Sequence, residues 1–252
     1  MRARSLLPLL LGALLLAGCQ TDDRGVQVDL GAALRAYRQR LDRKPGRAQV
    51  ERLVATLPAE QLTDLGVLYE REGRLDRAAW AYQQAIWRSP RFARAYVNLG
   101  NVLRRQGKPG EALFRYEQAM SADPGSFEAA NNFADLCAER RERLPEAIAR
   151  LSPFVQSPGP HRAYGLDTLG WLHHLQGDDP RAAELLGAAL PEAGERDLDL
   201  RLALHRHLAA VHAALGDSAA AAHHEAEAAR IERALPSPSG PSQQPPTKES
   251  RG

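Results

Sequence analysis

Histidine is the residue whose number and spacing in this chain come nearest to a reactive site. All eight histidines follow residue 160, and His205, His207 and His212 share one short segment. Imidazole nitrogens bind transition metals and transfer protons near neutral pH. No carboxylate or thiol converges on them in the sequence, however, and no nucleophile elbow, phosphate loop, HExxH or paired CxxC motif occurs. We therefore expect no catalytic residue, no metal and no enzyme. A histidine-dependent metal carrier or enzyme is the alternative.

A cysteine near the N-terminus is the second group that could react. Arg2 and Arg4 precede the apolar run Leu6–Ala17, and Leu16-Ala17-Gly18-Cys19 closes it. A charged start followed by an apolar run is typical of a secretory signal, here residues 1–18. The run is too short for a helix that crosses a bilayer, which takes about 20 residues.

The closing residues Leu16-Ala17-Gly18-Cys19 resemble the lipobox of bacterial lipoproteins, in which the cysteine is lipidated and becomes the first residue of the mature chain. The resemblance implies a covalent lipid such as palmitate on Cys19, no other cofactor, and a tether over residues 19–27. Gln20 is not the aspartate that retains lipoproteins at the inner membrane of enteric bacteria. We expect an outer membrane lipoprotein that faces the periplasm, with the inner membrane and a plain secretory signal as alternatives.

The remaining composition limits the partners. With Cys19 lipidated, Cys137 has no disulfide partner in the chain, and we expect a buried thiol. Removing Arg2 and Arg4 with the signal lowers Lys plus Arg from 33 to 31, equal to the 31 Asp plus Glu. This balance gives no electrostatic footprint for nucleic acid.

A register of small and large residues recurs through the chain with a period near 34 residues. A Leu-Gly pair or its equivalent is followed about twelve residues later by an alanine, and four residues after that by a large side chain. These positions are Leu65-Gly66, Leu99-Gly100, Phe133-Ala134, Leu169-Gly170 and Leu208-Ala209; then Ala78, Ala112, Ala147, Ala182 and Ala221; then Tyr82, Tyr116, Leu151 and Leu186. Two antiparallel helices per unit explain this register, because small residues let the backbones approach while large ones fill the space around the contact.

Turn residues support the same interpretation. Gly73, Gly107, Gly177 and Gly216 fall where the first helix of a unit must end, and glycine readily adopts the left-handed C-terminal cap. Pro90 and Pro124 close the second helix of the first two units, because proline cannot continue a helix.

The register resembles the tetratricopeptide repeat, a 34-residue helix–turn–helix unit. The resemblance implies an all-α, right-handed superhelical solenoid of antiparallel helix pairs, with five units at 59–92, 93–126, 127–161, 163–196 and 199–235. Units 127–161 and 199–235 are degenerate, and the former lacks the turn glycine. We expect an N-terminal helical cap or a divergent repeat over 28–57, and a disordered Pro/Ser-rich tail over 236–252.

In tetratricopeptide domains the first helices of the units line a concave groove that binds peptides or helices. The resemblance places in this groove Arg94, Val97, Asn101, Arg104, Arg105, Asn131, Asp135, Tyr164, Asp167, Trp171 and His174. Arginine and aromatic side chains dominate binding energy at protein interfaces, so we expect Tyr164 and Trp171 to be anchors. The alternative is that Trp171 packs between neighbouring repeats.

Together these patterns predict a membrane-anchored scaffold that binds other proteins of the cell envelope through its groove. Known lipoproteins of this layout imply an assembly factor for a pilus or secretin-type machine. An adaptor for peptidoglycan enzymes or for outer-membrane assembly is the alternative. The oligomeric state and the partner's identity do not follow from the sequence.

Overall fold

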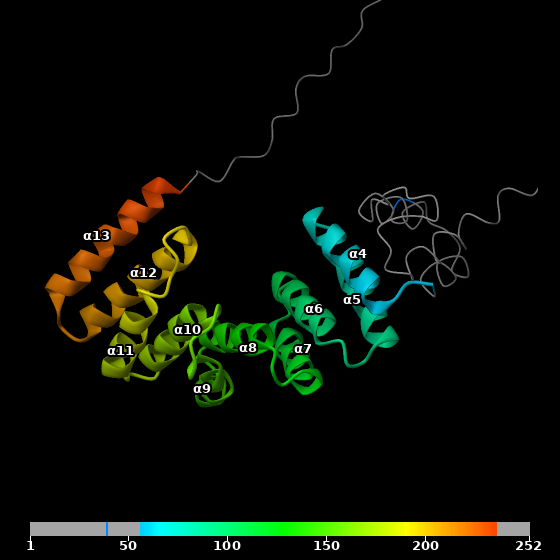
Figure 1. Cartoon of the computed structure of the whole chain (residues 1–252), viewed down its shortest axis with the longest axis horizontal. Coiled ribbons are helices and arrows are strands. Elements are labelled where there is room, and N and C mark those ends of the chain that lie inside the picture. Colours follow the sequence, from blue (N-terminus) through cyan, green and yellow to red (C-terminus); the bar gives the residue numbers. More distant parts are fainter. Residues whose placement is uncertain (1–38, 40–55, 236–252) are drawn as a thin grey trace, which may run out of the picture. The chain divides into compact units, whose positions relative to one another are not determined.

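The computed structural model describes residues 39 and 56–235. The predicted signal, Cys19, the tether, nearly all of the predicted cap over 28–57 and the tail over 236–252 lie outside the described residues. Within the described part, every regular element is a helix, and the chain is an all-α helical repeat solenoid (Figure 1). No described helix is long and apolar enough to cross a membrane.

The chain divides into two compact units at the bond between Arg140 and Arg141. The first unit contains α4 (Ala59–Arg71), α5 (Leu75–Arg88), α6 (Ala93–Arg105), α7 (Pro109–Ala122) and α8 (Phe127–Arg140). The second unit contains α9 (Leu144–Leu151), the 3-10 turn η1 (Ser152–Val155), α10 (Arg162–Leu175), α11 (Asp179–Ala189), α12 (Leu198–Ala214) and α13 (Ser218–Ala234). The boundary therefore falls between the two helices of the predicted unit 127–161.

Neighbouring helices pack in pairs within each unit. In the first unit α4 packs on α5, α6 packs on α7, and each pair is covered by the next helix: α6 contacts α4 and α5, and α8 contacts α6 and α7. In the second unit α10 packs on α11, α12 packs on α13, and α12 covers α10 and α11. We call α4, α6, α8, α10 and α12 the first helices, because each begins a repeat.

The contact between paired helices depends on a missing side chain. A Cβ atom added to Gly66 would lie 2.3 Å from the ring of Tyr82, and one added to Gly100 would lie 2.5 Å from the ring of Tyr116. At Gly170 the nearest atom would be Cγ of Leu186, at 2.6 Å. Both tyrosine rings and Leu186 are fully buried. The predicted small-and-large register is thus the register of the helix contact itself.

Four turns have the same backbone, with φ between +70° and +82° at Gly73, Gly107, Gly177 and Gly216. The amide after each glycine donates to a carbonyl five residues back, as from Arg74 to Tyr69 at 2.9 Å. This pattern satisfies carbonyls that the ending helix leaves unpaired. Between α8 and α9, where glycine is absent, Arg141 and Arg143 adopt φ of 52° and 55°.

Three helices of the second unit are capped at their starts by aspartates. The side chains of Asp178, Asp197 and Asp217 each accept a hydrogen bond from a backbone amide in the first turn of α11, α12 and α13, respectively. Such caps satisfy amides that have no partner within the helix. Cys137 is fully buried in α8, as expected for a thiol at an inward position.

Candidate protein-binding site

In the first unit, ion pairs join each first helix to the next. An Arg94 Nη donates to Asp64 Oδ1 at 3.0 Å, linking α6 to α4, and an Arg105 Nη donates to Glu70 Oε1 at 3.0 Å between the same helices. Arg104 pairs with Glu139 and links α6 to α8. All three arginines that we predicted for partner recognition therefore lie on the face built by α4, α6 and α8. Each is held there by a carboxylate of a neighbouring first helix.

Asn101 lies at the centre of this face and receives two hydrogen bonds. The Tyr116 hydroxyl donates to Asn101 Oδ1 at 2.8 Å, and the Asn132 amide donates to the same oxygen at 3.0 Å. Burial raises the pKa of Tyr116 to about 12, so its hydroxyl remains a donor at neutral pH. On α8, Asn131 donates to Asp135 at 3.2 Å. Through Asn101, the buried Tyr116 between α6 and α7 is linked to the polar side chains of α6 and α8.

The structure corrects two predicted groove residues. Only 7% of Val97 and 9% of Asp167 are exposed, so these side chains belong to the packing of α6 and α10 and not to an accessible surface. The arginines differ from Val97, because half of each of Arg94 and Arg105 remains exposed. Exposed ion pairs contribute about 0–1 kcal/mol, so a partner can exchange them for its own charges at small cost.

In the second unit, Trp171 is half-buried and stacks on a histidine of the next first helix. Its ring lies 4.4 Å from the His207 ring at an angle of 18°, and 4.9 Å from the His174 ring. His207 Nδ1 lies 2.8 Å from Oδ1 of Asp167, which is only 9% exposed, and His174 Nδ1 lies 2.5 Å from Asp179 Oδ1. Trp171 thus contacts the neighbouring repeat while part of its ring remains accessible.

Tyr164 lies seven residues before Trp171 on α10 and is 41% exposed. Its hydroxyl donates to Asp197, the residue that caps α12, and this hydrogen bond to a carboxylate raises the pKa of Tyr164. The exposed ring and the half-buried indole together give the α10–α12 face an aromatic surface with a polar rim. Surfaces of this kind are typical of interface anchors.

One register position was missed by the sequence analysis. The residue before each Leu-Gly mark or its equivalent is polar in all five repeats, and the five are Asp64, Asn98, Asn132, Thr168 and His207. Asp64, Asn132 and His207 make the contacts to the adjacent first helix that are described above. A polar residue repeated at a fixed register was the available signal, and it marks side chains that join one repeat to the next.

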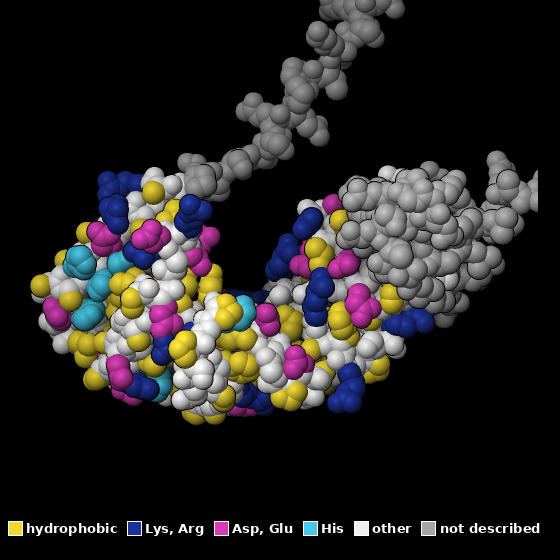
Figure 2. All heavy atoms as spheres, in the orientation of Figure 1, with side chains coloured by type: hydrophobic (Ala, Val, Ile, Leu, Met, Phe, Trp, Pro, Cys, Tyr) yellow, Lys and Arg dark blue, Asp and Glu magenta, His cyan; other side chains and the backbone are white. Residues whose placement is uncertain are grey.

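The remaining histidines gather on the last helix pair. His205 is buried, and its Nδ1 atom lies 3.0 Å from His224 Nδ1. The rings of His212 and His223 lie 5.5 and 5.1 Å from the His224 ring. Figure 2 shows histidine side chains concentrated over the α12–α13 pair. Among the described residues, no group of three or more His, Cys, Asp and Glu side chains is arranged to hold a metal ion.

The comparisons with known proteins agree with this geometry. The tetratricopeptide repeat family matches residues 63–127 and, in an overlapping match, residues 98–159. No curated protein sequence matches the chain. Among solved structures, PilW, described as a widely conserved type IV pilus biogenesis factor, aligns with a TM-score of 0.63 and 19% identity, over 71% of this chain and 79% of its own.

Two further structures share the fold. MamA from Desulfovibrio magneticus RS-1 aligns with a TM-score of 0.58 and 18% identity, over 71% of this chain and 97% of its own. PilF from Pseudomonas aeruginosa aligns with a TM-score of 0.50 and 19% identity, over 70% and 93%. At these identities the likeness concerns the fold. Residues 63–159 match the tetratricopeptide repeat family, and the helix pairs with their shared contact register show the same repeat fold in the described part of the chain.

Proposed function

We propose that this chain is a membrane-anchored scaffold of the cell envelope that captures other proteins through the first helices of each of its two units. The single observation that carries the capture is the set of accessible arginine and aromatic side chains on these helices, namely Arg94, Arg104 and Arg105 in the first unit and Tyr164 and Trp171 in the second. Each is at least partly accessible, and each is held in position by a neighbouring first helix or by the residue that caps it. Fixed aromatic and guanidinium groups lose little conformational freedom when a partner binds.

The membrane anchor is supported by the sequence alone. Cys19 follows a short apolar run at the spacing of a lipobox, and a lipid there would hold the scaffold at the outer membrane on the periplasmic side. Attachment to a surface raises the effective concentration of the scaffold near partners in the same membrane. Two or more acyl chains make the attachment durable, because each buried methylene contributes about 0.8 kcal/mol.

Replacing Cys19 by serine is expected to abolish lipid attachment, because a serine hydroxyl does not substitute for the acylated thiol. In cells fed an alkyne analogue of palmitate, the unmodified chain should become labelled. Cys137→Ser is the matched control, because it changes the other, buried thiol, and it should be labelled equally. Cys19→Ser would carry no label above background. Labelling of Cys19→Ser at the level of the unmodified chain would refute the anchor.

The partner that we favour is a component of a pilus or secretin-type assembly machine. PilW shares the fold over most of both chains and is named as a type IV pilus biogenesis factor. A peptidoglycan enzyme or an outer-membrane assembly component is the alternative. Crosslinking in cells, followed by purification from membranes and mass spectrometry, separates the two: pilus or secretin components support the proposal, and wall hydrolases or synthases support the alternative.

Replacing Trp171 by alanine is expected to reduce the crosslinked partner by about tenfold or more, as is common when an interface anchor is truncated. The helical signal in circular dichroism should stay unchanged. Trp87→Ala is the matched control, because Trp87 is 70% exposed on α5, a second helix. If Trp171→Ala instead lowers the unfolding temperature strongly and leaves capture intact, Trp171 serves the packing of repeats and not the partner.

A further inference from the structure

The last helix pair lacks the large side chain that fills the contact in other pairs. Tyr82, Tyr116 and Leu186 occupy that position opposite Gly66, Gly100 and Gly170. In the register of α12 and α13 the corresponding residues are Glu225 and Ala209. Glu225 is exposed and therefore does not fill the contact as the buried tyrosines and leucine do.

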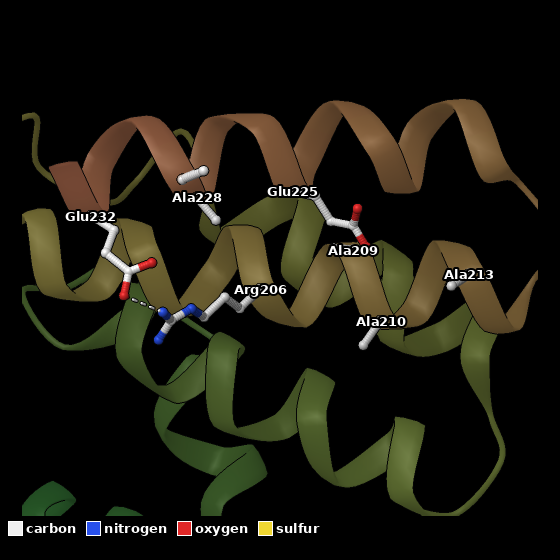
Figure 3. A pocket seen from close by; sticks show the side chains of 8 residues that line it. Arg206, Ala209, Ala210, Ala213, Glu225, Ala228 and Glu232 are labelled. Carbon is white, nitrogen blue, oxygen red and sulfur yellow. Dashed lines mark hydrogen bonds and ion pairs between the residues drawn. The ribbon is translucent and has the colours of Figure 1, made fainter.

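An open hollow of about 400 Å³ lies at this position between α12 and α13 (Figure 3). Its charged lining residues are Arg206, Glu225 and Glu232, and the other five are alanines of the two helices. Arg206 is neutralised by Glu232, with a nitrogen-to-oxygen distance of 2.9 Å. Glu225 points from α13 toward α12 at Ala209, and no described residue forms an ion pair or hydrogen bond with it. The hollow is thus apolar at its base and carries one uncompensated carboxylate.

The hollow occupies the face that a following helix covers elsewhere in the chain. Arg206 and Ala210 correspond in register to Asp167 and Trp171 of α10, and both of those residues contact His207 on the next first helix, α12. The pairs α4–α5 and α6–α7 are covered in the same way by α6 and α8. In the part of the chain that the structure describes, no helix follows α13. Because a helix covers the equivalent face of the earlier helix pairs, we infer that this face also accepts a helix.

The composition of residues 236–252 does not favour such a helix. Residues 236–252 contain prolines throughout and have no Leu, Ile, Val, Met or aromatic residue. Proline breaks helices, and a segment without large apolar side chains cannot fill an alanine-lined hollow. This segment therefore does not offer the large apolar side chain that the hollow would accept.

We propose that the hollow between α12 and α13 docks a basic amphipathic helix of a partner protein. That helix inserts one leucine or aromatic side chain among the alanines and places a lysine or arginine against Glu225. Helix-in-groove recognition of this kind uses a large apolar anchor for affinity and a rim charge for orientation. This site lies at the end of the helix stack. It is a second docking surface, which does not require that the α10 aromatic residues bind anything.

The test uses a helix of this chain as a defined probe. Residues 91–106 contain α6, which covers the α4–α5 pair, and carry Arg91, Arg94, Arg104 and Arg105 together with Tyr96. A lactam-bridged peptide of this sequence would be titrated into the isotope-labelled mature chain, with amide chemical shifts as the readout. We expect saturable shifts that map to residues 203–232 of α12 and α13.

Two substitutions of Glu225 separate shape from charge. Glu225→Leu fills the hollow with the side chain that repeat four has at this position, and should weaken peptide binding by at least about tenfold while the protein remains folded. Glu225→Gln keeps the size, removes the charge and should weaken binding by about threefold. Glu227→Leu is the matched control, because Glu227 lies on α13 outside the lining and pairs with Arg230. Glu227→Leu and Trp171→Ala should bind like the unmodified chain.

Other results would overturn the proposal. Absence of saturable shifts, shifts that map away from α12 and α13, or unchanged binding by Glu225→Leu would each do so. If sedimentation shows a dimer that Glu225→Leu dissociates, the occupant is a second copy of this chain. If deletion of residues 236–252 alone shifts the amides that line the hollow, the chain's own tail covers it. If Trp171→Ala loses capture of the crosslinked partner but still binds the peptide, the result bears on the proposed scaffold function and not on the hollow.

Discussion

Replacing Tyr116 by alanine is expected to lower the free energy of unfolding by about 3–5 kcal/mol, the usual cost of removing a large buried aromatic ring. Tyr116 is fully buried between α6 and α7, its ring fills the space above Gly100, and its hydroxyl donates to Asn101 at 2.8 Å. Tyr116→Phe keeps the ring and removes only that hydrogen bond, so about 1 kcal/mol should be lost. Urea unfolding followed by circular dichroism measures both changes.

The same contact makes the effect of Gly100→Ala depend on Tyr116. In the unmodified chain a Cβ atom at residue 100 would lie 2.5 Å from the Tyr116 ring, and overpacking of this kind typically costs about 1–3 kcal/mol. In the Tyr116→Ala background the obstacle is gone, and alanine in a helix is more stable than glycine by about 0.5–1 kcal/mol. The effect of Gly100→Ala is therefore expected to change sign between the two backgrounds.

Gly187→Ala is the control for this double-mutant cycle. Gly187 lies within α11, is exposed, and has no atom within 4 Å of an added Cβ. Its substitution should stabilise the chain slightly in either background, because only the helix preference changes. If Gly100→Ala has the same effect whether or not Tyr116 is present, the two helices do not meet through this pair of residues.

This pair also shows why so much of the fold could be predicted from the sequence. Gly100 and Tyr116 are sixteen residues apart, and their residue types alone indicate the contact, because only glycine permits the ring to lie against its backbone. The turn glycines are similar: Gly107 and its equivalents need a positive φ, which other residues adopt at a cost. Because both signals recur with one period, the helix pairs can be predicted from the sequence.

The candidate site could be predicted only in part, because it depends on contacts between side chains that are distant in the sequence. The exposed arginines were located from the repeat register, but their carboxylate partners on neighbouring first helices were not. Arg105 reaches Glu70 across a separation of 35 residues, and sequence spacing alone does not select that partner from other nearby carboxylates. Val97 failed for a different reason: a register position that faces the groove in the family is buried by local packing in this chain.

The number and spacing of the histidines suggested metal binding or proton transfer. Their surroundings in the structure instead indicate a stability that depends on pH. Burial lowers the pKa of His205 and of His224 below the ordinary value of 6.5. Arg201, His223 and Arg230 also lower the pKa of His205, while Glu227 opposes them. With the two Nδ1 atoms 3.0 Å apart, one ring donates its proton and the other accepts it. Protonating both rings removes the acceptor and places two positive charges side by side.

Acidification from about pH 7.5 to about pH 5.5 is therefore expected to destabilise the last helix pair. In the unfolded chain these histidines bind protons around pH 6.5, whereas the folded chain resists protonation until the pH is lower. The unfolded state thus holds more protons in this window, and the free energy of unfolding falls as the pH falls. Above the unfolded pKa both states are neutral, so the stability should be nearly independent of these two groups.

The double substitution His205→Leu and His224→Gln should flatten this pH dependence. The first repeat has a buried leucine, Leu62, at the position equivalent to His205, so the fold can accommodate a leucine at residue 205. His161→Gln is the control, since His161 is exposed and lies outside the histidine cluster on α12 and α13, and it should retain the slope of the unmodified chain. Urea unfolding at several pH values would measure the slopes. A double variant that loses stability as steeply as the unmodified chain would show that other groups control the acid response.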